Sequence, residues 1–486
     1  MKQKNNIDKT RLFIFLNFND EEIYNFKRKL KTKFNFSKIF WSTWTQYSKK
    51  NFDDLSISSL VKIDTYVMNY IKDYKIKNYK IYNEIYEKYF STYISMLTRR
   101  TSRDIISNPL ELRHHFNIHY RFIEKYFLTK SIDWLIIPPS YSGGFDLLIG
   151  VIPKYYGVKT IYLENFHSKK FFYTTDWKDW GYFNKSKEIF NKKEVFIYEK
   201  DPTELFYLNQ YAKSYSGSLA FKYRVLFIYE ISILLVKTFI LSLFSKKILI
   251  KSFFETSSKL YMKATREKFK INSIKVLDKN FNNLNIKYVY FAMSFQPEAT
   301  TLSYGDEYDD QILAIEKIDK IIPNDWSILV KEHPFHSDPF YRGNLFYERL
   351  KLIKSVTIIP TSKFSNDDLI INSQFVSTVT GNTGWESIRL LKPVLVFGRP
   401  WYLTCPGVKN IDQLDNLLDF IEMKWSLQDI KEHIEKLSLK MGDGLINRDY
   451  LNAKDIFNDF KTTKYNKDKN IDNILNSISK IMENYE

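Results

Sequence analysis

The chain has 486 residues and a formal net charge of +17, and its composition is 44% hydrophobic and 17% aromatic. At roughly 150 residues per domain this length predicts two to three domains, and the apolar content excludes an intrinsically disordered chain. The single cysteine, Cys405, excludes an intramolecular disulfide framework and fits a reducing compartment. The positive charge predicts an anionic partner or surface. The net charge is weak evidence for such a partner, because an AT-rich genome would also enrich Lys, Asn, Ile and Tyr.

Two further classes are not expected from the sequence. No recognised nucleic-acid-binding module or basic-aromatic repeat is found, so nucleic acid is not an expected partner. The first eleven residues are polar and charged, and the apolar run 12–18 is too short for a signal peptide. A cytoplasmic location is therefore expected.

The first part of the chain predicts an α/β domain over residues 1–222. Apolar runs at 11–18, 131–138 and 158–163 predict buried strands, and a small-residue loop follows the second of them. Residues 145–156 predict a helix, so that strand, helix and strand form a βαβ unit.

Three titratable residues of this domain are candidates for a catalytic acid or base. Glu164 and His167 follow the strand 158–163, and Asp146 stands at the start of the predicted helix. A titratable side chain just past the carboxyl end of a strand can act as a general base on a bound ligand. The alternative is that they are ordinary surface residues.

The middle of the chain, residues 223–283, predicts a helical insertion. Val225–Phe244 is 20 residues long and mostly apolar, but Glu230 and Lys237 lie on one helical face. Residues 245–279 carry ten Lys or Arg against three Asp or Glu. Together, residues 224–279 suit peripheral attachment to an anionic membrane surface on the inner face of the cell membrane. The alternative is an insertion that packs on the protein itself.

A second α/β domain is predicted over residues 284–460, followed by a linker and a C-terminal helix at 461–486. Apolar runs predict five strands in this domain: 287–295, 326–330, 356–359, 375–379 and 394–397. Helices are predicted between them, at 309–322 and 385–391 among others. The last helix of the chain is expected to pack back across the first domain.

Three of these strands end in polar motifs marked by proline or glycine. The motifs are Gln296-Pro297-Glu298, Lys331-Glu332-His333-Pro334 and Thr380-Gly381-Asn382-Thr383-Gly384. Because the carboxyl ends of parallel strands meet at one edge of a sheet, the motifs are expected to form one ligand site. No metal-ligand spacing is found among them, so neither a metal nor a cofactor is expected.

Each motif has a chemical use in such a site. Glu298 can accept hydrogen bonds from a ribose or base, and His333 beside Lys331 can donate to a phosphate oxygen. The glycine turn before a helix can offer its backbone N–H groups to an anion. Thr383 and Glu386 have the spacing of a capping box, which predicts a structural role for Glu386.

Together these motifs resemble the capsule polysaccharide biosynthesis family, which includes bacterial transferases of Kdo (3-deoxy-manno-octulosonic acid). The resemblance covers roughly residues 286–405 and adds Gln311 and the segment 392–402 to the motifs above. It implies a GT-B glycosyltransferase with two Rossmann-like domains facing a cleft, and a nucleotide-sugar donor on the second domain. It also implies that Gln296 and Glu298 match the family's QxE, His333 and Pro334 its HP, and Thr380 and Thr383 its phosphate loop.

The expected function is therefore metal-independent glycosyl transfer in capsule or surface polysaccharide biosynthesis. The donor would be a nucleotide-sugar, most naturally CMP-linked, and the acceptor a glycan or glycolipid. Two alternatives stay open: a CDP-polyol phosphotransferase of similar fold, and a non-catalytic partner in capsule assembly or export.

Overall fold

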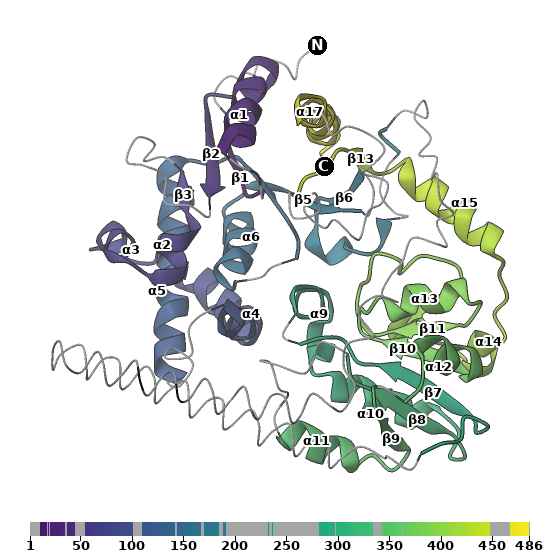
Figure 1. Ribbon diagram of the computed structural model, residues 1–486. Helices are drawn as coiled ribbons and strands as arrows, with labels where there is room; N and C mark the ends of the chain where they lie inside the picture. Colours follow the sequence, from purple (N-terminus) through teal and green to yellow (C-terminus); the bar gives the residue numbers. More distant parts are fainter. Residues whose placement is uncertain are drawn as a thin grey trace.

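The computed structural model describes residues 10–43, 54–100, 109–140, 143–166, 170–183, 188–190, 232, 236, 281–333, 342, 344–447 and 467–485, with positions 17, 19, 35, 297 and 362 left out of these ranges. It contains two α/β domains, each built around one β-sheet, and helix α9 (Ala299–Tyr304) lies between them (Figure 1). The expected α/β fold with two Rossmann-like domains is confirmed.

The first sheet has seven strands in the spatial order β13-β6-β5-β4-β1-β2-β3. Neighbours from β5 to β3 are parallel, whereas β6 is antiparallel to both β5 and β13. The strands are β1 (Arg11–Ile14), β2 (Lys38–Thr43), β3 (Leu55–Ser56), β4 (Trp134–Ile137), β5 (Lys159–Asn165), β6 (Lys170–Thr174) and β13 (Gly442–Asp443).

Helices cover both faces of this sheet, so its strands carry apolar side chains on both sides. On β1, Phe13 joins one hydrophobic core and Leu12 and Ile14 join the other. The helices are α1 (Asp20–Phe34), α2 (Ile57–Lys62), α3 (Thr65–Ile71), α4 (Tyr79–Arg100), α5 (Pro109–Lys130), α6 (Phe145–Tyr155) and the 3-10 turn η2 (Trp177–Asp179).

The second sheet has six strands, all parallel, in the order β12-β11-β10-β7-β8-β9. The strands are β7 (Tyr288–Ala292), β8 (Ser327–Lys331), β9 (Val356–Ile359), β10 (Phe375–Thr378), β11 (Val394–Val396) and β12 (Val408–Asn410). Besides α9, the helices and turns are η6 (Asp306–Asp309), α10 (Gln311–Ile321), α11 (Asn344–Lys351), α12 (Asn366–Asn372), α13 (Thr383–Arg389), η7 (Ile411–Gln413), α14 (Leu417–Ile421) and α15 (Leu427–Ser438).

Strand order decides where a ligand can bind in each sheet. Counted along the chain, the second sheet follows the order of a dinucleotide-binding Rossmann fold, and the parallel part of the first sheet repeats five strands of it. In such sheets the connections leave in opposite directions on either side of one strand pair, so a crevice opens beyond their carboxyl ends. That pair is β7 and β10 in the second sheet, and β1 and β4 in the first.

The C-terminal segment returns to the first domain. Strand β13 pairs with β6, and α17 (Lys467–Glu483) lies beside α1 (Figure 1). Apolar residues of α17 at three- and four-residue spacing, including Ile471, Ile474 and Ile478, are buried in the same core as Leu12. The predicted return of the last helix is confirmed, and the segment expected to end the second domain supplies a strand to the first sheet.

The two domains contact each other through an aromatic cluster. Trp180 of the first domain stacks on Tyr304 of the second, with ring centroids 5.2 Å apart and an angle of 12° between the planes. Phe166, Phe172 and Trp385 belong to the same buried cluster. The carboxyl-end loops of the two sheets are thereby held close together.

The predicted helical insertion at 223–283 falls almost wholly outside the described residues, as does the attachment surface expected at 224–279. Among the helices of the described ranges, none is both long enough and apolar enough to cross a membrane. The predicted domain boundaries stay predictions.

Candidate nucleotide-sugar site

The structure brings the three predicted motifs to one edge of the second sheet. Gln296 and Glu298 follow β7, His333 follows β8, and the turn Thr380–Gly384 follows β10. Strands β7 and β10 form the central pair at which the strand order reverses, and β8 lies next to β7. The motifs therefore surround the position at which open α/β sheets bind ligands.

Glu298 begins helix α9 as its N-cap residue. Its Oε2 accepts from the Thr301 backbone N–H at 3.2 Å, and also from the Thr300 and Thr301 hydroxyls. Within the described residues, all three hydrogen bonds to this carboxylate are accepted by Oε2. The cap thus fixes the carboxylate at the carboxyl end of β7, with its second oxygen available for a ribose or base.

A hydroxyl contact joins the two sides of the central strand pair. Thr301 Oγ1 on α9 lies 3.3 Å from Thr380 Oγ1 on the turn after β10, and both residues are buried. The Glu298 carboxylate and the Thr380 turn are therefore adjacent.

The Thr380–Gly384 turn is held by Tyr402, whose hydroxyl donates to the Gly381 carbonyl. A Cβ on Gly384 would lie 2.2 Å from the Tyr402 hydroxyl oxygen, so only glycine fits against this ring. The Gly381 N–H is 3.2 Å from Thr378 Oγ1, to which it donates. Packing and local bonds thus fix the turn in one conformation.

The predicted capping box in this turn is wrong. The N-cap of α13 is Asn382, which is exposed and makes no side-chain cap, and Thr383 is already the first helical residue. The Asn382 backbone has helical φ and ψ angles, so its side chain is not placed to cap. Since α13 has only seven residues, we also assign no separate anion site to its dipole.

Glu386 is instead half-buried in a polar cluster with Lys331. Burial, aided by the Asp367 charge, raises the pKa of Glu386 to about 7. The Lys331 ammonium donates to Phe364 O and Asn366 Oδ1, both at 2.9 Å, and burial lowers its pKa to about 8. Lys331 therefore lies against the start of α12. Glu386 is a titratable neighbour of Lys331, whereas the sequence pattern predicted only a capping role for it.

His333 is half-buried beside Phe295, with ring centroids 5.7 Å apart. Burial lowers its pKa; the neighbouring Glu332 carboxylate raises it and the Arg342 guanidinium lowers it further. The ring is therefore mainly neutral at pH 7, and a neutral imidazole keeps one N–H that can donate to a phosphate oxygen. Pro334 lies outside the described residues.

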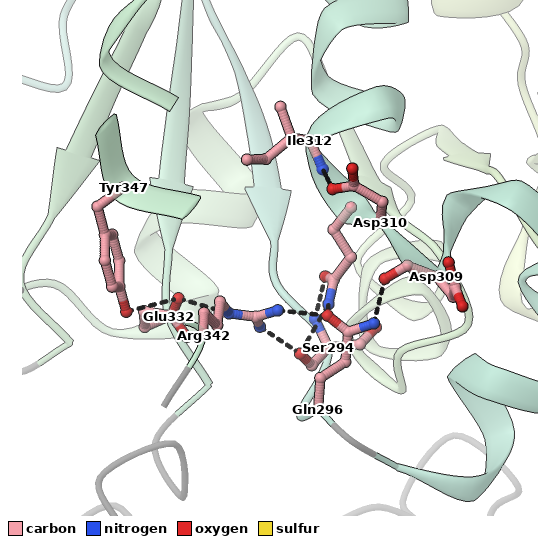
Figure 2. A network of polar contacts seen from close by, with 9 residues as sticks. Ser294, Gln296, Asp309, Asp310, Ile312, Glu332, Arg342 and Tyr347 are labelled. Carbon is pink, nitrogen blue, oxygen red and sulfur yellow. Dashed lines mark hydrogen bonds and ion pairs between the residues drawn. The ribbon is translucent and has the colours of Figure 1, made fainter. Parts of the chain in front are cut away.

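A buried polar network supports the loops after β7 and β8 (Figure 2). Gln311 donates to Gln296 Oε1 at 2.7 Å, and Arg342 contacts both Gln296 and Glu332. Gln296 in turn donates to the Asp309 carbonyl. Gln296 is thus committed to internal contacts. Arg342 lies outside every predicted motif, and its sequence neighbours gave no signal for it.

The first domain contributes Glu164 at the end of β5. Burial raises the pKa of this carboxyl to about 7, opposed by a hydrogen bond from the Ser140 hydroxyl and supported by the charge of Glu298. Glu164 and Glu298 therefore influence each other across the junction between the domains. A carboxyl whose pKa is near 7 can exchange a proton at neutral pH.

Of the other two predicted catalytic candidates, the structure describes only Asp146. Asp146 is buried and accepts from the backbone N–H groups of Gly143 and Leu147, both at 3.0 Å, so it stabilises the start of α6. His167 lies outside the described residues. Of the two candidates that the structure describes, Glu164 is the one whose titration is influenced by Glu298 of the second domain.

Two further features of the described residues bear on what this site can hold. Within the described ranges no group of three His, Cys, Asp or Glu side chains is arranged to hold a metal ion. A cavity of about 380 Å³ lies between α1 and α17, lined by residues such as Lys29, Lys33 and Asp472. The cavity lies on the first domain, away from the carboxyl ends of β7, β8 and β10 (Figure 1). Lys29 and Asp472, which line it, already form an ion pair with each other.

Comparison with solved structures finds weak likenesses. Two structures of KpsC from Thermosulfurimonas dismutans are among them. The beta Kdo 2,4 transferase is 16% identical, with 38% of this chain and 57% of that chain covered and a TM-score of 0.23. The beta Kdo 2,7 transferase is 13% identical, with 73% and 89% covered and a TM-score of 0.29.

A UDP-GlcNAc 2-epimerase from Methanocaldococcus jannaschii is 12% identical, with 88% of this chain and 99% of that chain covered and a TM-score of 0.24. TM-scores as low as these do not support an inference about activity. The chain also spans only 57% of the length of the 2,4 transferase. No curated protein matches the chain.

A family model gives a more specific result. Residues 298–418, about a quarter of the chain, match the model described as capsule polysaccharide biosynthesis protein. The matched range contains Glu298, His333 and the Thr380–Gly384 turn. It confirms, for most of the second domain, the resemblance to the capsule polysaccharide biosynthesis family.

Proposed function

We propose that the chain is a glycosyltransferase of capsule or surface polysaccharide biosynthesis that uses a nucleotide-activated sugar, most simply a CMP-linked ulosonic acid such as Kdo. The observation that carries this proposal is the convergence of Glu298, His333 and the Thr380 turn at the strand pair where a Rossmann-like sheet binds nucleotides. The family match over 298–418 supports it.

The donor phosphate sits between His333 and the Thr380–Gly384 turn in this proposal. A neutral His333 donates one N–H, and the hydroxyls of the turn supply further donors together with its N–H groups other than those of Gly381 and Gly384, which already donate within the protein. Hydrogen bonds to a charged group contribute about 1.5–3 kcal/mol each, which is enough to hold a phosphate in one orientation. The free oxygen of Glu298 accepts from the ribose or base.

Glu164 is the proposed general base. It takes the proton of the acceptor hydroxyl as that oxygen bonds to the anomeric carbon, while the bond from this carbon to the CMP phosphate oxygen breaks. The donors around the phosphate stabilise the negative charge that develops on the departing nucleotide. Ser140 orients the Glu164 carboxyl through its hydroxyl.

A donor screen tests the proposal. CMP-Kdo, other CMP-sugars, UDP-sugars and a CDP-polyol are titrated by calorimetry, and nucleotide release is followed with glycan and glycolipid acceptors. We expect binding and release with a CMP-sugar, and loss of both in His333→Ala. If no CMP- or UDP-sugar binds, and if His333→Ala leaves the cellular glycan unchanged, the proposal is wrong.

The same screen separates the two alternatives. A phosphodiester product from the CDP-polyol would identify a polyol phosphotransferase, whereas a glycosidic product supports the proposal. Binding of a donor without nucleotide release over many acceptors would identify a non-catalytic assembly partner.

A further inference from the structure

We infer that Arg342 is a positioning residue of the donor site, whose guanidinium holds the loop after β7 and the loop after β8 in one fixed relation. The inference rests on the proposed function, because both loops carry residues that we assign to the donor. Nothing in the sequence motifs points to Arg342, which stands ten residues after Glu332 and just before α11.

The geometry of the guanidinium supports this role (Figure 2). Its Nε donates to Glu332 Oε1 at 2.9 Å, its Nη2 to the Ser294 carbonyl at 2.6 Å, and its Nη1 to Gln296 Oε1. The side chain is 3% exposed. One planar fork therefore bonds to both loops, an arrangement that a lysine ammonium cannot reproduce.

The loop after β7 depends on this contact for its shape. Gln296 Oε1 receives donors from Arg342 and from Gln311, and Gln311 is itself bonded to the Ser294 backbone at 2.8 and 3.0 Å. With both of its amide atoms engaged, Gln296 has one conformation. The chain then runs directly to Glu298, so a displaced Gln296 would move the carboxylate that we assign to the ribose or base.

Arg342 affects the loop after β8 through its charge, which acts on His333. Apart from burial, the groups that set the His333 titration are the Glu332 carboxylate and the Arg342 guanidinium, which act in opposite directions. Glu332 is adjacent to His333 in the sequence and pairs with Arg342, and the Tyr347 hydroxyl lies 3.4 Å from the same Glu332 oxygen. Without the guanidinium, the Glu332 charge acts alone on His333 and favours the imidazolium.

Two substitutions and one matched control test the inference. Arg342→Met removes the charge and the fork, whereas Arg342→Lys keeps a cation opposite Glu332 and loses the fork. Arg349→Met is the control, because Arg349 lies on the neighbouring α11 and forms an exposed ion pair with Asp310. The measurements are CMP affinity by calorimetry and the His333 titration by NMR on histidine-labelled protein, assigned with His333→Gln.

We expect Arg342→Met to weaken CMP binding at least tenfold and to raise the His333 pKa. Arg342→Lys should leave the His333 pKa near its wild-type position while CMP affinity stays at least tenfold weaker. The control should change neither quantity. A residue that served stability alone would not produce this separation between the two readouts.

Each contrary result has a definite meaning. Wild-type CMP affinity in Arg342→Lys overturns the inference, and this variant decides the question if Arg342→Met does not fold. If the wild-type protein binds neither CMP nor a nucleotide-sugar, the proposed function fails. The positioning role is then judged by NMR, and an unchanged His333 pKa in Arg342→Met overturns it.

Discussion

The raised pKa of Glu164 makes a prediction in which stability and activity change in opposite directions. In the folded protein this carboxyl titrates near pH 7, whereas its ordinary pKa is 4.5. Between these two values the folded state binds more protons than the unfolded state, so the free energy of unfolding falls as the pH rises. At about 1.36 kcal/mol per pKa unit, the full loss is about 3 kcal/mol.

The variant Glu164→Gln keeps the shape of the side chain and cannot ionise. We expect it to lack this loss, so that at pH 8 it is more stable than the wild type by up to about 3 kcal/mol, and near pH 4.5 the two are similar. We also expect kcat to fall about 10²–10⁴-fold if Glu164 is the base. In the wild type, kcat/KM should rise with pH through about 7.

Urea unfolding of both proteins at several values between pH 4.5 and 8 measures the first quantity. Other carboxyls contribute to the pH dependence of the wild type, since Glu386 and Asp309 also have raised pKa values, so the difference between the two proteins is the relevant quantity. Glu348→Gln, an exposed carboxylate, is the control. An identical pH dependence of stability in wild type and Glu164→Gln would refute the reasoning.

Three further predictions concern packing and membrane attachment. Gly384→Ala places a methyl group 2.2 Å from the Tyr402 hydroxyl oxygen and should destabilise the protein by about 1–3 kcal/mol in thermal unfolding. Adding Tyr402→Phe removes the nearest of the three clashing atoms and should recover part of this loss, and an unchanged stability of Gly384→Ala would contradict the packing of the turn on Tyr402. Ile474→Ala, at a fully buried position of α17, should cost about 2–5 kcal/mol, whereas Glu483→Ala on the exposed side should change little; equal effects would contradict the packing of α17 on the first sheet. The full chain should sediment with phosphatidylglycerol vesicles at low salt, and deletion of 224–279 should abolish this binding, whereas phosphatidylcholine vesicles should bind neither the full chain nor the deletion variant. If the deletion variant still sediments with phosphatidylglycerol vesicles, this segment is not the attachment surface.

Local patterns in the sequence were sufficient for five of the six strands of the second sheet, β7 to β11, whereas β12 and the short strands β3, β6 and β13 of the first sheet were not predicted. Runs such as 375–379 and 394–397 are continuous and apolar because both faces of a parallel strand are covered, and β10 and β11 lie at those positions. The position of a polar motif directly after such a run already implies the edge of the sheet at which it lies. For this reason the amino-acid sequence was enough to group Glu298, His333 and Thr380 at one edge of the second sheet.

Features that depend on contacts between distant segments could be found only in the tertiary structure. The T-x-x-E spacing predicted a capping box, but the helix begins one residue earlier than that motif requires, and Glu386 is drawn into a cluster with Lys331, 55 residues away in the chain. Arg342 has no local signal, because its role comes from three acceptors on two different loops.

The catalytic candidates show the same division. Sequence position made Glu164 and Asp146 equivalent, since both lie near strand or helix ends. The structure separates them, because Asp146 accepts from backbone N–H groups at the start of α6, whereas Glu164 is half-buried at the junction with the second domain, where Glu298 acts on it. The sequence by itself determined which residue types lie at the carboxyl ends of the strands. The tertiary structure decided which of them meet, because burial and charge at a junction of two domains depend on both.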